Sequence, residues 1–307
     1  MASTKAFIFA SFLLLLSLFV NAFAVPDVPL EIPGMRLLPM GWAPWGPVSE
    51  RDGDREAFAG HDSPLEIPTS KAHSFSNHVS GAGHVEKLGS LNSYVTGSPK
   101  SKHAIILASD VYGYEAPNLS SSVVKETGRQ VCGCWILCGG PDFFHGEPFD
   151  PNNTNRPKDA WLNDHRPEKA FEEAKPLIKD LKHKGFSAVG AAGFCWGAKL
   201  VIELAKLKNF VQATAILHPS FVTLDDIKEV KVPLAIFGAE LDKQYPPELI
   251  KQFEEVLHSH KIGYFAKIYA GVKHGFTIRY DVLGGVSYER AMEAQMDLLK
   301  WFTKHVK

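Results

Sequence analysis

The stretch "SAVGAAGFCWGAKLVIELAK", residues 187–206, passes from an apolar, strand-like run into a helix-like run, with Cys195 at the junction between Gly193 and Gly197. Gly-x-Cys-x-Gly at such a junction is the thiol form of the nucleophile elbow, a sharp turn that strains the backbone of the nucleophile. The helix dipole and unpaired N–H groups at a helix start favour a thiolate. The stretch therefore predicts a nucleophilic cysteine. The alternative is a buried cysteine that only packs.

Short apolar runs and helical patterns alternate along the rest of the chain. Strands are predicted at 103–109, 132–138, 211–217, 232–238 and 264–270. Helices are predicted at 168–184 (with a kink at Pro176), 196–208, 246–259 and 286–305, and a hairpin or two short strands at 84–97. This alternation predicts an α/β fold with a mostly parallel sheet flanked by helices. Active sites in such sheets lie beyond the carboxyl ends of the strands.

Two further polar residues follow predicted strands directly. Asp242 comes just after 232–238, and His274 comes just after 264–270. The chain order nucleophile, acid, base is that of α/β-hydrolases. In a Cys–His–Asp triad the histidine handles protons and the acid fixes the imidazole tautomer. We therefore predict a triad of Cys195, Asp242 and His274, with Glu240 as a competing acid.

An acyl-transfer site also needs donors for the oxyanion that forms during attack. One predicted donor is the backbone N–H of Trp196, the residue after the nucleophile. The second should come from the loop after the strand at 103–109, where Val111 is the candidate.

The N-terminal part of the chain has a different composition. Residues 1–24 carry Lys5, an apolar run and an Ala-x-Ala ending, which predicts a cleaved signal peptide. Residues 25–80 are rich in Pro, Gly, Ser and charged residues and predict a low-order extension. The α/β-hydrolase domain is expected at 81–307, in a secreted protein. An uncleaved anchor, or a cytoplasmic protein whose N-terminus is a gene-model artefact, are the alternatives.

Composition narrows the classes of partner and cofactor. The chain has 307 residues, a formal net charge of -1 and four cysteines. That charge gives no overall field for nucleic acid or for an anionic membrane after signal cleavage. Cys132, Cys134 and Cys138 are interpreted as strand residues, of which two could pair in an oxidising compartment, and no second ligand pair stands at a zinc-site spacing. We therefore expect no metal and no organic cofactor, and we also expect a monomer. A small-molecule ester or lactone substrate is what the family resemblance described next implies.

Six separated motifs carry a family resemblance over about residues 80–307. They read "LASDVYGYEAPN", "PDFFHGEPF", "GFCWGAK", "LHPSF", "FGAELDKQYPP" and "KHGFTIRYD". Together they resemble the dienelactone hydrolases, particularly a plant branch with some members labelled endo-1,3;1,4-β-D-glucanases. The resemblance implies an α/β-hydrolase fold, opening of cyclic esters, and the Cys195, Asp242 and His274 triad. It also implies that Asp110, where bacterial members have Glu, holds the resting thiol, and that Arg279 binds a substrate carboxylate.

Two other functions stay open at this point. A glucan hydrolase would need two carboxylates across the sugar bond, for which Asp110 and Glu147 can be proposed, and tryptophans 161 and 196 could stack sugars. A non-catalytic binding protein on the same scaffold is suggested by the stretch at 119–140, which departs from the family pattern.

Overall fold

The computed structural model describes residues 83–98, 100–115, 135–281 and 283–307, without the side chains of 135–139. The predicted signal peptide, the extension at 25–80, most of the stretch at 119–140, and Cys132 and Cys134 lie outside these residues. Within the described parts of the chain, no helix combines the length and the apolar character that crossing a membrane requires.

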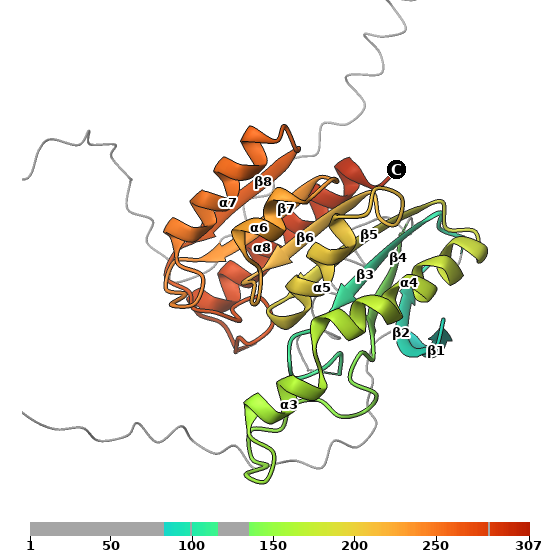
Figure 1. Ribbon diagram of the computed structural model, residues 1–307, viewed down its shortest axis with the longest axis horizontal. Helices are drawn as coiled ribbons and strands as arrows, with labels where there is room; N and C mark the ends of the chain where they lie inside the picture. Colours follow the sequence, from blue (N-terminus) through green and yellow to red (C-terminus); the bar gives the residue numbers. More distant parts are fainter. Residues whose placement is uncertain (1–82, 99, 116–134, 282) are drawn as a thin grey trace, which may run out of the picture. The chain divides into compact units, whose positions relative to one another are not determined.

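One eight-stranded sheet organises the described chain (Figure 1), in the order β1-β2-β4-β3-β5-β6-β7-β8. Its strands are β1 (His84–Leu88), β2 (Leu91–Gly97), β3 (His103–Ala108), β4 (Trp135–Pro141), β5 (Ala188–Phe194), β6 (Ala213–Leu217), β7 (Leu234–Ala239) and β8 (Tyr264–Tyr269). β1 and β2 form an antiparallel hairpin, β2 pairs antiparallel with β4, and all later pairings are parallel. The predicted mostly parallel sheet is confirmed.

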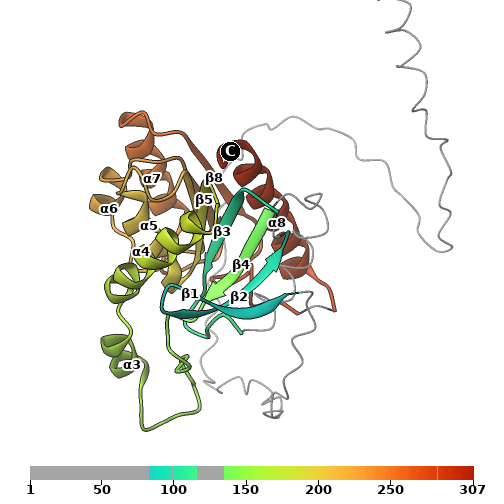
Figure 2. The same ribbon diagram turned by 90° about the vertical axis from the view of Figure 1, so that its right-hand side faces the viewer.

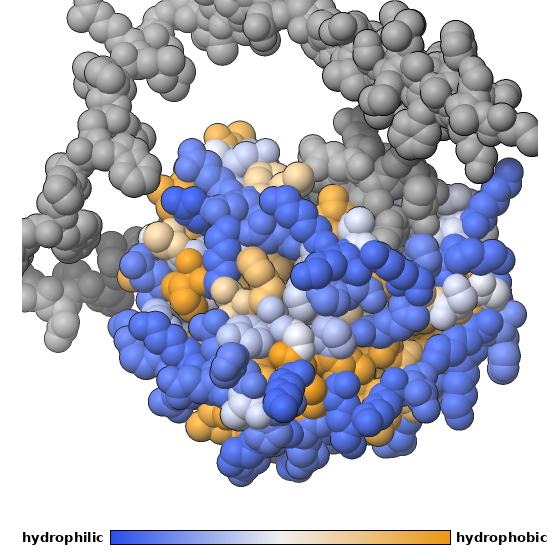
Figure 3. Space-filling view, turned by 90° about the horizontal axis from the view of Figure 1, so that it is seen from above, coloured by the Kyte–Doolittle hydropathy of each residue, from blue (hydrophilic) through white to orange (hydrophobic). Residues whose placement is uncertain are grey.

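Helices flank the sheet on both faces (Figures 1 and 2). α4 (Pro167–His183), α5 (Trp196–Ala205), α6 (Leu224–Lys228) and α7 (Pro247–Ser259) gather on one face, and α8 (Val286–His305) runs along the other. Figure 3, which views this domain from above, shows a surface dominated by hydrophilic side chains, with smaller apolar areas between them.

The centre of the sheet is built from small residues. Every residue of β5 is buried, and five of its seven residues are alanine or glycine, which leaves room for helices on both sides. A Cβ at Gly190 would come within 2.9 Å of Phe302 of α8 and 2.8 Å of Ile105 of β3. α8 can therefore pack directly against the middle of the sheet, because this strand offers it no side chain there.

Most predicted elements occur, with ends displaced by a few residues. The strand predicted at 103–109 spans His103–Ala108, and the helix predicted at 196–208 ends at Ala205. α4 continues through Pro176, and the two residues that follow it, Leu177 and Ile178, are fully buried in the core. Two short helices were not predicted, α3 (Lys158–Asp164) and α6, since neither is long enough to show a helical period.

Candidate active site

The turn between β5 and α5 has the backbone of a nucleophile elbow. Cys195 adopts φ 51° and ψ -108°, a conformation that L-residues rarely hold. Its N–H donates to the Leu217 carbonyl at 3.1 Å, which ties the turn to β6. A Cβ at Gly193 would collide with the Gly197 backbone, and a Cβ at Gly197 with the Ala108 carbonyl. The two glycines are required because three backbone segments meet here.

His274 and Asp242 meet at the same edge of the sheet. His274 Nδ1 lies 2.7 Å from Asp242 Oδ2, although 32 residues separate them along the chain. Asp242 Oδ1 accepts hydrogen bonds from the backbone N–H groups of Gln244 at 2.9 Å and Tyr245 at 3.2 Å. The competing acid, Glu240, is exposed and accepts from the Gly271 N–H at 2.7 Å instead. Asp242 is therefore the carboxylate that contacts the imidazole.

The thiol and the imidazole shift each other's pKa in opposite directions. Burial raises the pKa of the Cys195 thiol, but the hydrogen bond and charge of His274 outweigh burial and bring it below its usual value. Burial lowers the pKa of His274, but hydrogen bonds to Asp242 and Cys195 raise it to about 9. The directions of these shifts favour a thiolate beside an imidazolium, whose Nδ1 faces the Asp242 carboxylate.

The two residues predicted to supply the oxyanion hole flank the elbow. Trp196 is the first residue of α5, and the Gly197 N–H donates to the Ser109 carbonyl at 3.1 Å, which joins the helix start to the loop that carries Val111. Among the described backbone hydrogen bonds outside regular helices and strands, none uses the N–H of Trp196 or of Val111 as donor. Their role toward an oxyanion stays a prediction.

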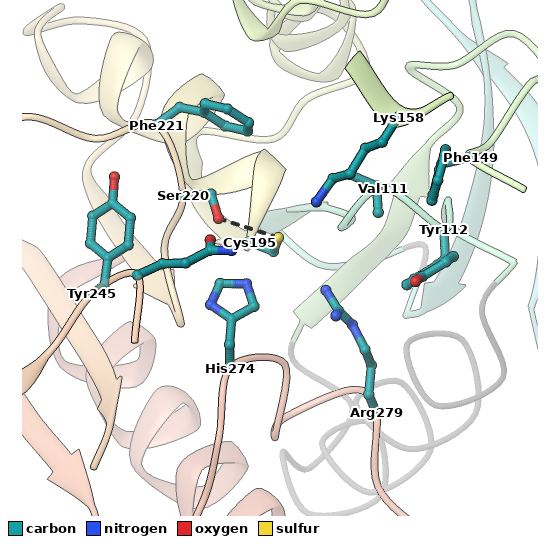
Figure 4. Close-up of a pocket in the computed structure, with 11 residues that line it drawn as sticks. Val111, Tyr112, Phe149, Lys158, Cys195, Ser220, Phe221, Tyr245, His274 and Arg279 are labelled. Carbon is teal, nitrogen blue, oxygen red and sulfur yellow. Dashed lines mark hydrogen bonds between the residues drawn. The ribbon is translucent and has the colours of Figure 1, made fainter. Parts of the chain in front are cut away.

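A pocket of about 380 Å³ opens above the thiol (Figure 4). Among the residues that the structure describes, its lining combines aromatic and cationic side chains and includes no carboxylate. The residues are Val111, Tyr112, Phe149, Lys158, Cys195, Ser220, Phe221, Gln244, Tyr245, His274 and Arg279. Lys158 and Arg279 approach the thiol from two sides in Figure 4. Such a lining favours a planar or apolar substrate that carries negative charge.

Comparison with known proteins assigns this chain to a family. The model of the dienelactone hydrolase family matches residues 91–306, which includes every residue of the proposed site. The chain belongs to the dienelactone hydrolase family. As a member it is a hydrolase of the ester and lactone class, which confirms the resemblance seen in the six motifs.

Similar proteins come from a plant, a mammal and a cyanobacterium. An endo-1,3;1,4-beta-D-glucanase of Zea mays is 43% identical over 169 residues, which are 55% of this chain and 52% of the maize protein. The chain thus matches about half the length of that relative. A carboxymethylenebutenolidase homolog of Mus musculus is 27% identical over 233 residues, 74% of this chain and 92% of the mouse protein. The solved dienelactone hydrolase of Anabaena variabilis shares the fold, with a TM-score of 0.52 and 13% identity, and the match covers 73% of this chain and 97% of that one.

Asp110 contacts Arg279, and not the Cys195 thiol that the family resemblance implied as its partner. Its Oδ2 accepts from Arg279 Nε at 2.8 Å, and its Oδ1 accepts from the Tyr112 N–H at 3.0 Å. Burial raises the pKa of Asp110, while the charge of Arg279 opposes that rise. The thiol instead contacts the Ser220 hydroxyl at 3.4 Å. Asp110 therefore orients the arginine rather than holding the sulfur in this structure.

Ser220 and Lys158 are among the pocket residues that the sequence analysis missed. Ser220 lies in the "LHPSF" motif directly after β6, a position that the strand-end argument could have found. Lys158 begins α3, and nothing in the polar stretch before it indicates that the chain returns to the sheet edge there. The predicted Arg279 does line the pocket.

Proposed function

We propose that this protein hydrolyses small esters or lactones through Cys195, His274 and Asp242. The observation that carries the proposal is the convergence of the three side chains at one sheet edge, with a 2.7 Å contact between the imidazole and the carboxylate. The lowered pKa of Cys195 and the raised pKa of His274 supply a nucleophile and an acid at the same pH. No cofactor is needed for this chemistry.

Acylation begins with attack of the Cys195 thiolate on the carbonyl carbon. The carbonyl oxygen becomes an oxyanion, which the N–H groups of Trp196 and Val111 would bind. Collapse of the tetrahedral intermediate breaks the bond between the carbonyl carbon and the ester oxygen. The departing alkoxide takes a proton from the imidazolium of His274, which leaves a thioester on Cys195 and a neutral imidazole.

Deacylation returns the protons to their starting places. Neutral His274 takes a proton from water, and the hydroxide attacks the thioester carbon. The second intermediate collapses with release of the carboxylic acid and the thiolate. Asp242 accepts the Nδ1–H bond throughout, so that the imidazole presents its other nitrogen to the sulfur and to water.

The substrate is proposed to carry an anionic group. Arg279 donates a hydrogen bond from Nε to Asp110, which fixes the plane of the guanidinium group, and the Arg279 side chain lines the pocket. Lys158 also lines the pocket and makes no ion pair among the described residues. Two cations, with no carboxylate among the described lining residues, favour a carboxylate or an enolate on the substrate, and the aromatic side chains of Tyr112 and Phe149 favour an apolar or planar body.

The test is hydrolysis of an aryl ester and of a dienelactone by the wild-type protein and by Cys195→Ala and Cys195→Ser. We expect both variants to lose activity while they keep the thermal unfolding midpoint of the wild type. Trapping the acyl group on the Cys195 peptide, identified by mass spectrometry, should succeed only in the wild type. Turnover that persists in Cys195→Ala would refute the thiol mechanism.

A glucan hydrolase remains the second candidate, because the maize relative at 43% identity bears that name. Glycoside hydrolysis commonly uses two carboxyl groups across the scissile bond. The described pocket lining has none: Glu147 is exposed and paired with Arg156, and Asp110 is paired with Arg279. Trp161 and Trp196 are fully buried, so neither offers a face to a sugar. Digestion of a mixed-linkage glucan that continues after alkylation of the thiol would favour this candidate.

A further inference from the structure

The sulfur of Cys195 has a hydroxyl beside it that the triad does not use. Ser220 Oγ lies 3.4 Å from Cys195 Sγ, and both residues are buried. Among the described residues this sulfur is the one hydrogen-bond partner of the Ser220 hydroxyl. The Ser220 backbone N–H also donates to the Cys195 carbonyl at 3.0 Å. Ser220 is therefore bonded to the nucleophile through its backbone and its side chain.

The chemistry of the pair decides which atom donates. A thiolate has no proton to give, so a hydroxyl next to it must be the donor. The direction of the Cys195 and His274 pKa shifts favours that ionised form, and the Ser220 hydrogen bond is among the causes that lower the Cys195 pKa. A hydrogen bond to a charged acceptor is stronger than one between neutral groups.

The loop that carries Ser220 is strained on both sides of it. His218 has φ 37° and Phe221 has φ 62°, and neither residue type holds such values without support. The support is visible: His218 Nε2 lies 2.7 Å from Thr277 Oγ1 in the core, and the Val222 N–H donates to the Tyr245 hydroxyl at 2.7 Å. Strain that is held by tertiary contacts on either side of one serine indicates that its placement matters.

We propose that Ser220 is the residue that holds the resting Cys195 thiolate, by donating its hydroxyl hydrogen to the sulfur. The resemblance gave this position to Asp110, but Asp110 is bonded to Arg279 and to the Tyr112 N–H. A hydroxyl stabilises the thiolate by donating a hydrogen bond to it, whereas an ionised carboxylate has no proton to donate and repels the thiolate. In this protein the nucleophile is thus kept ionised before substrate arrives. The proposal rests on the proposed function, since it concerns the same thiol.

Other charged and titratable groups surround the sulfur and act on it too. His274 comes from the loop after β8, and Arg279 follows it on the same segment. Lys158 and Tyr245 line the pocket from α3 and from the loop before α7. Behind this layer lie the two carboxylates, Asp242 on His274 and Asp110 on Arg279. Ser220 is neutral, so its removal changes no charge around the sulfur.

The experiment measures the rate of Cys195 alkylation by iodoacetamide from pH 4 to pH 10 on the full chain. The modified Cys195 peptide is quantified by mass spectrometry, which separates it from the other cysteines. The midpoint is the pH at which the alkylation rate of Cys195 reaches half of its maximum. In Ser220→Ala we expect this midpoint to rise by about one pH unit, which means a roughly tenfold smaller thiolate fraction at pH values below it. Ser220→Thr keeps a hydroxyl and should retain the wild-type midpoint. Ser259→Ala, which removes an exposed hydroxyl bonded to the Val256 carbonyl, is the matched control.

An unchanged midpoint in Ser220→Ala would overturn the proposal. An equal rise in Ser220→Ala and Ser220→Thr would overturn it as well, because the loop and not the hydroxyl would then matter. This readout needs no substrate, so it stays separate from the proposed function. A protein whose Cys195→Ala variant still hydrolyses esters, but whose Ser220→Ala variant shows the shifted midpoint, would refute the thiol mechanism and uphold the role of Ser220.

Discussion

Replacing Asp242 with asparagine tests the electrostatics of the triad with almost no change in side-chain volume. Asp242 Oδ1 could still accept from the Gln244 and Tyr245 N–H groups, so the loop after β7 should keep its shape. The contact with His274 changes, because one partner of the 2.7 Å pair loses its charge. An amide N–H that faces Nδ1 would also stabilise the wrong imidazole tautomer.

The size of the loss can be worked from the pKa of His274. That pKa is about 9, against an ordinary value of 6.5, and the hydrogen bond to Asp242 is the largest cause that raises it. The difference of about 2.5 units corresponds to about 3 kcal/mol at roughly 1.4 kcal/mol per unit. If Asp242 supplies most of it, kcat/KM should fall by roughly 300-fold.

The assay is kcat/KM for an aryl ester between pH 5 and pH 10, with Asp242→Asn compared with the wild type. Glu240→Gln is the matched control, since Glu240 follows the same strand but bonds the Gly271 N–H, and it should change kcat/KM by less than about twofold. An Asp242→Asn enzyme within about threefold of the wild type would refute the reasoning. So would an equal loss in Glu240→Gln, because the acid would then be misassigned.

Three further outcomes are expected. Because the His274 pKa is raised to about 9, the imidazolium that protonates the leaving group persists to that pH, and kcat/KM should fall as the pH rises through it; a falling limb near pH 6.5 would contradict this. Lys158→Met should lower kcat/KM by about tenfold for an ester that carries a carboxylate and by less than twofold for a neutral one; an equal effect on both esters would remove Lys158 from anion binding. Gly197→Ala places a Cβ against the Ala108 carbonyl and should lower the free energy of unfolding by about 3 kcal/mol in a urea titration, whereas Gly263→Ala, whose Cβ meets nothing within 4 Å, should be close to neutral.

The sequence predicts the parts of the fold and site that follow from local pattern. β5 is one unbroken buried run, and the residues just after the strand ends, Cys195, Asp242 and His274, could be picked out because parallel strands deliver their carboxyl ends to one edge. α3 could not be predicted, because its seven residues begin after a proline and show one buried side chain, Trp161. A helix so short is fixed by tertiary contacts and not by its own period.

Side-chain contacts between distant segments could not be predicted either, because they too depend on tertiary structure. Asp110 and Arg279 are 169 positions apart, and which partner Asp110 takes depends on the path of two loops. Each loop follows a strand that could be predicted, but loop conformation is set by side-chain hydrogen bonds that leave no periodic signal. The contact of Ser220 with the sulfur is of this kind. Motif order therefore predicted the proposed triad, while the contacts of its members with other residues came from the structure.

The residues that line the pocket come from two kinds of segment, the strand ends of the sheet and the segment between β4 and α4. The reacting groups stand on strand ends of the central sheet, whereas Phe149 and Lys158 belong to the single excursion between β4 and α4. That excursion supplies no member of the triad and no part of the elbow. The part of substrate preference that Phe149 and Lys158 determine can thus evolve, or be transplanted from a relative, by exchange of one continuous segment while the proposed triad is left intact.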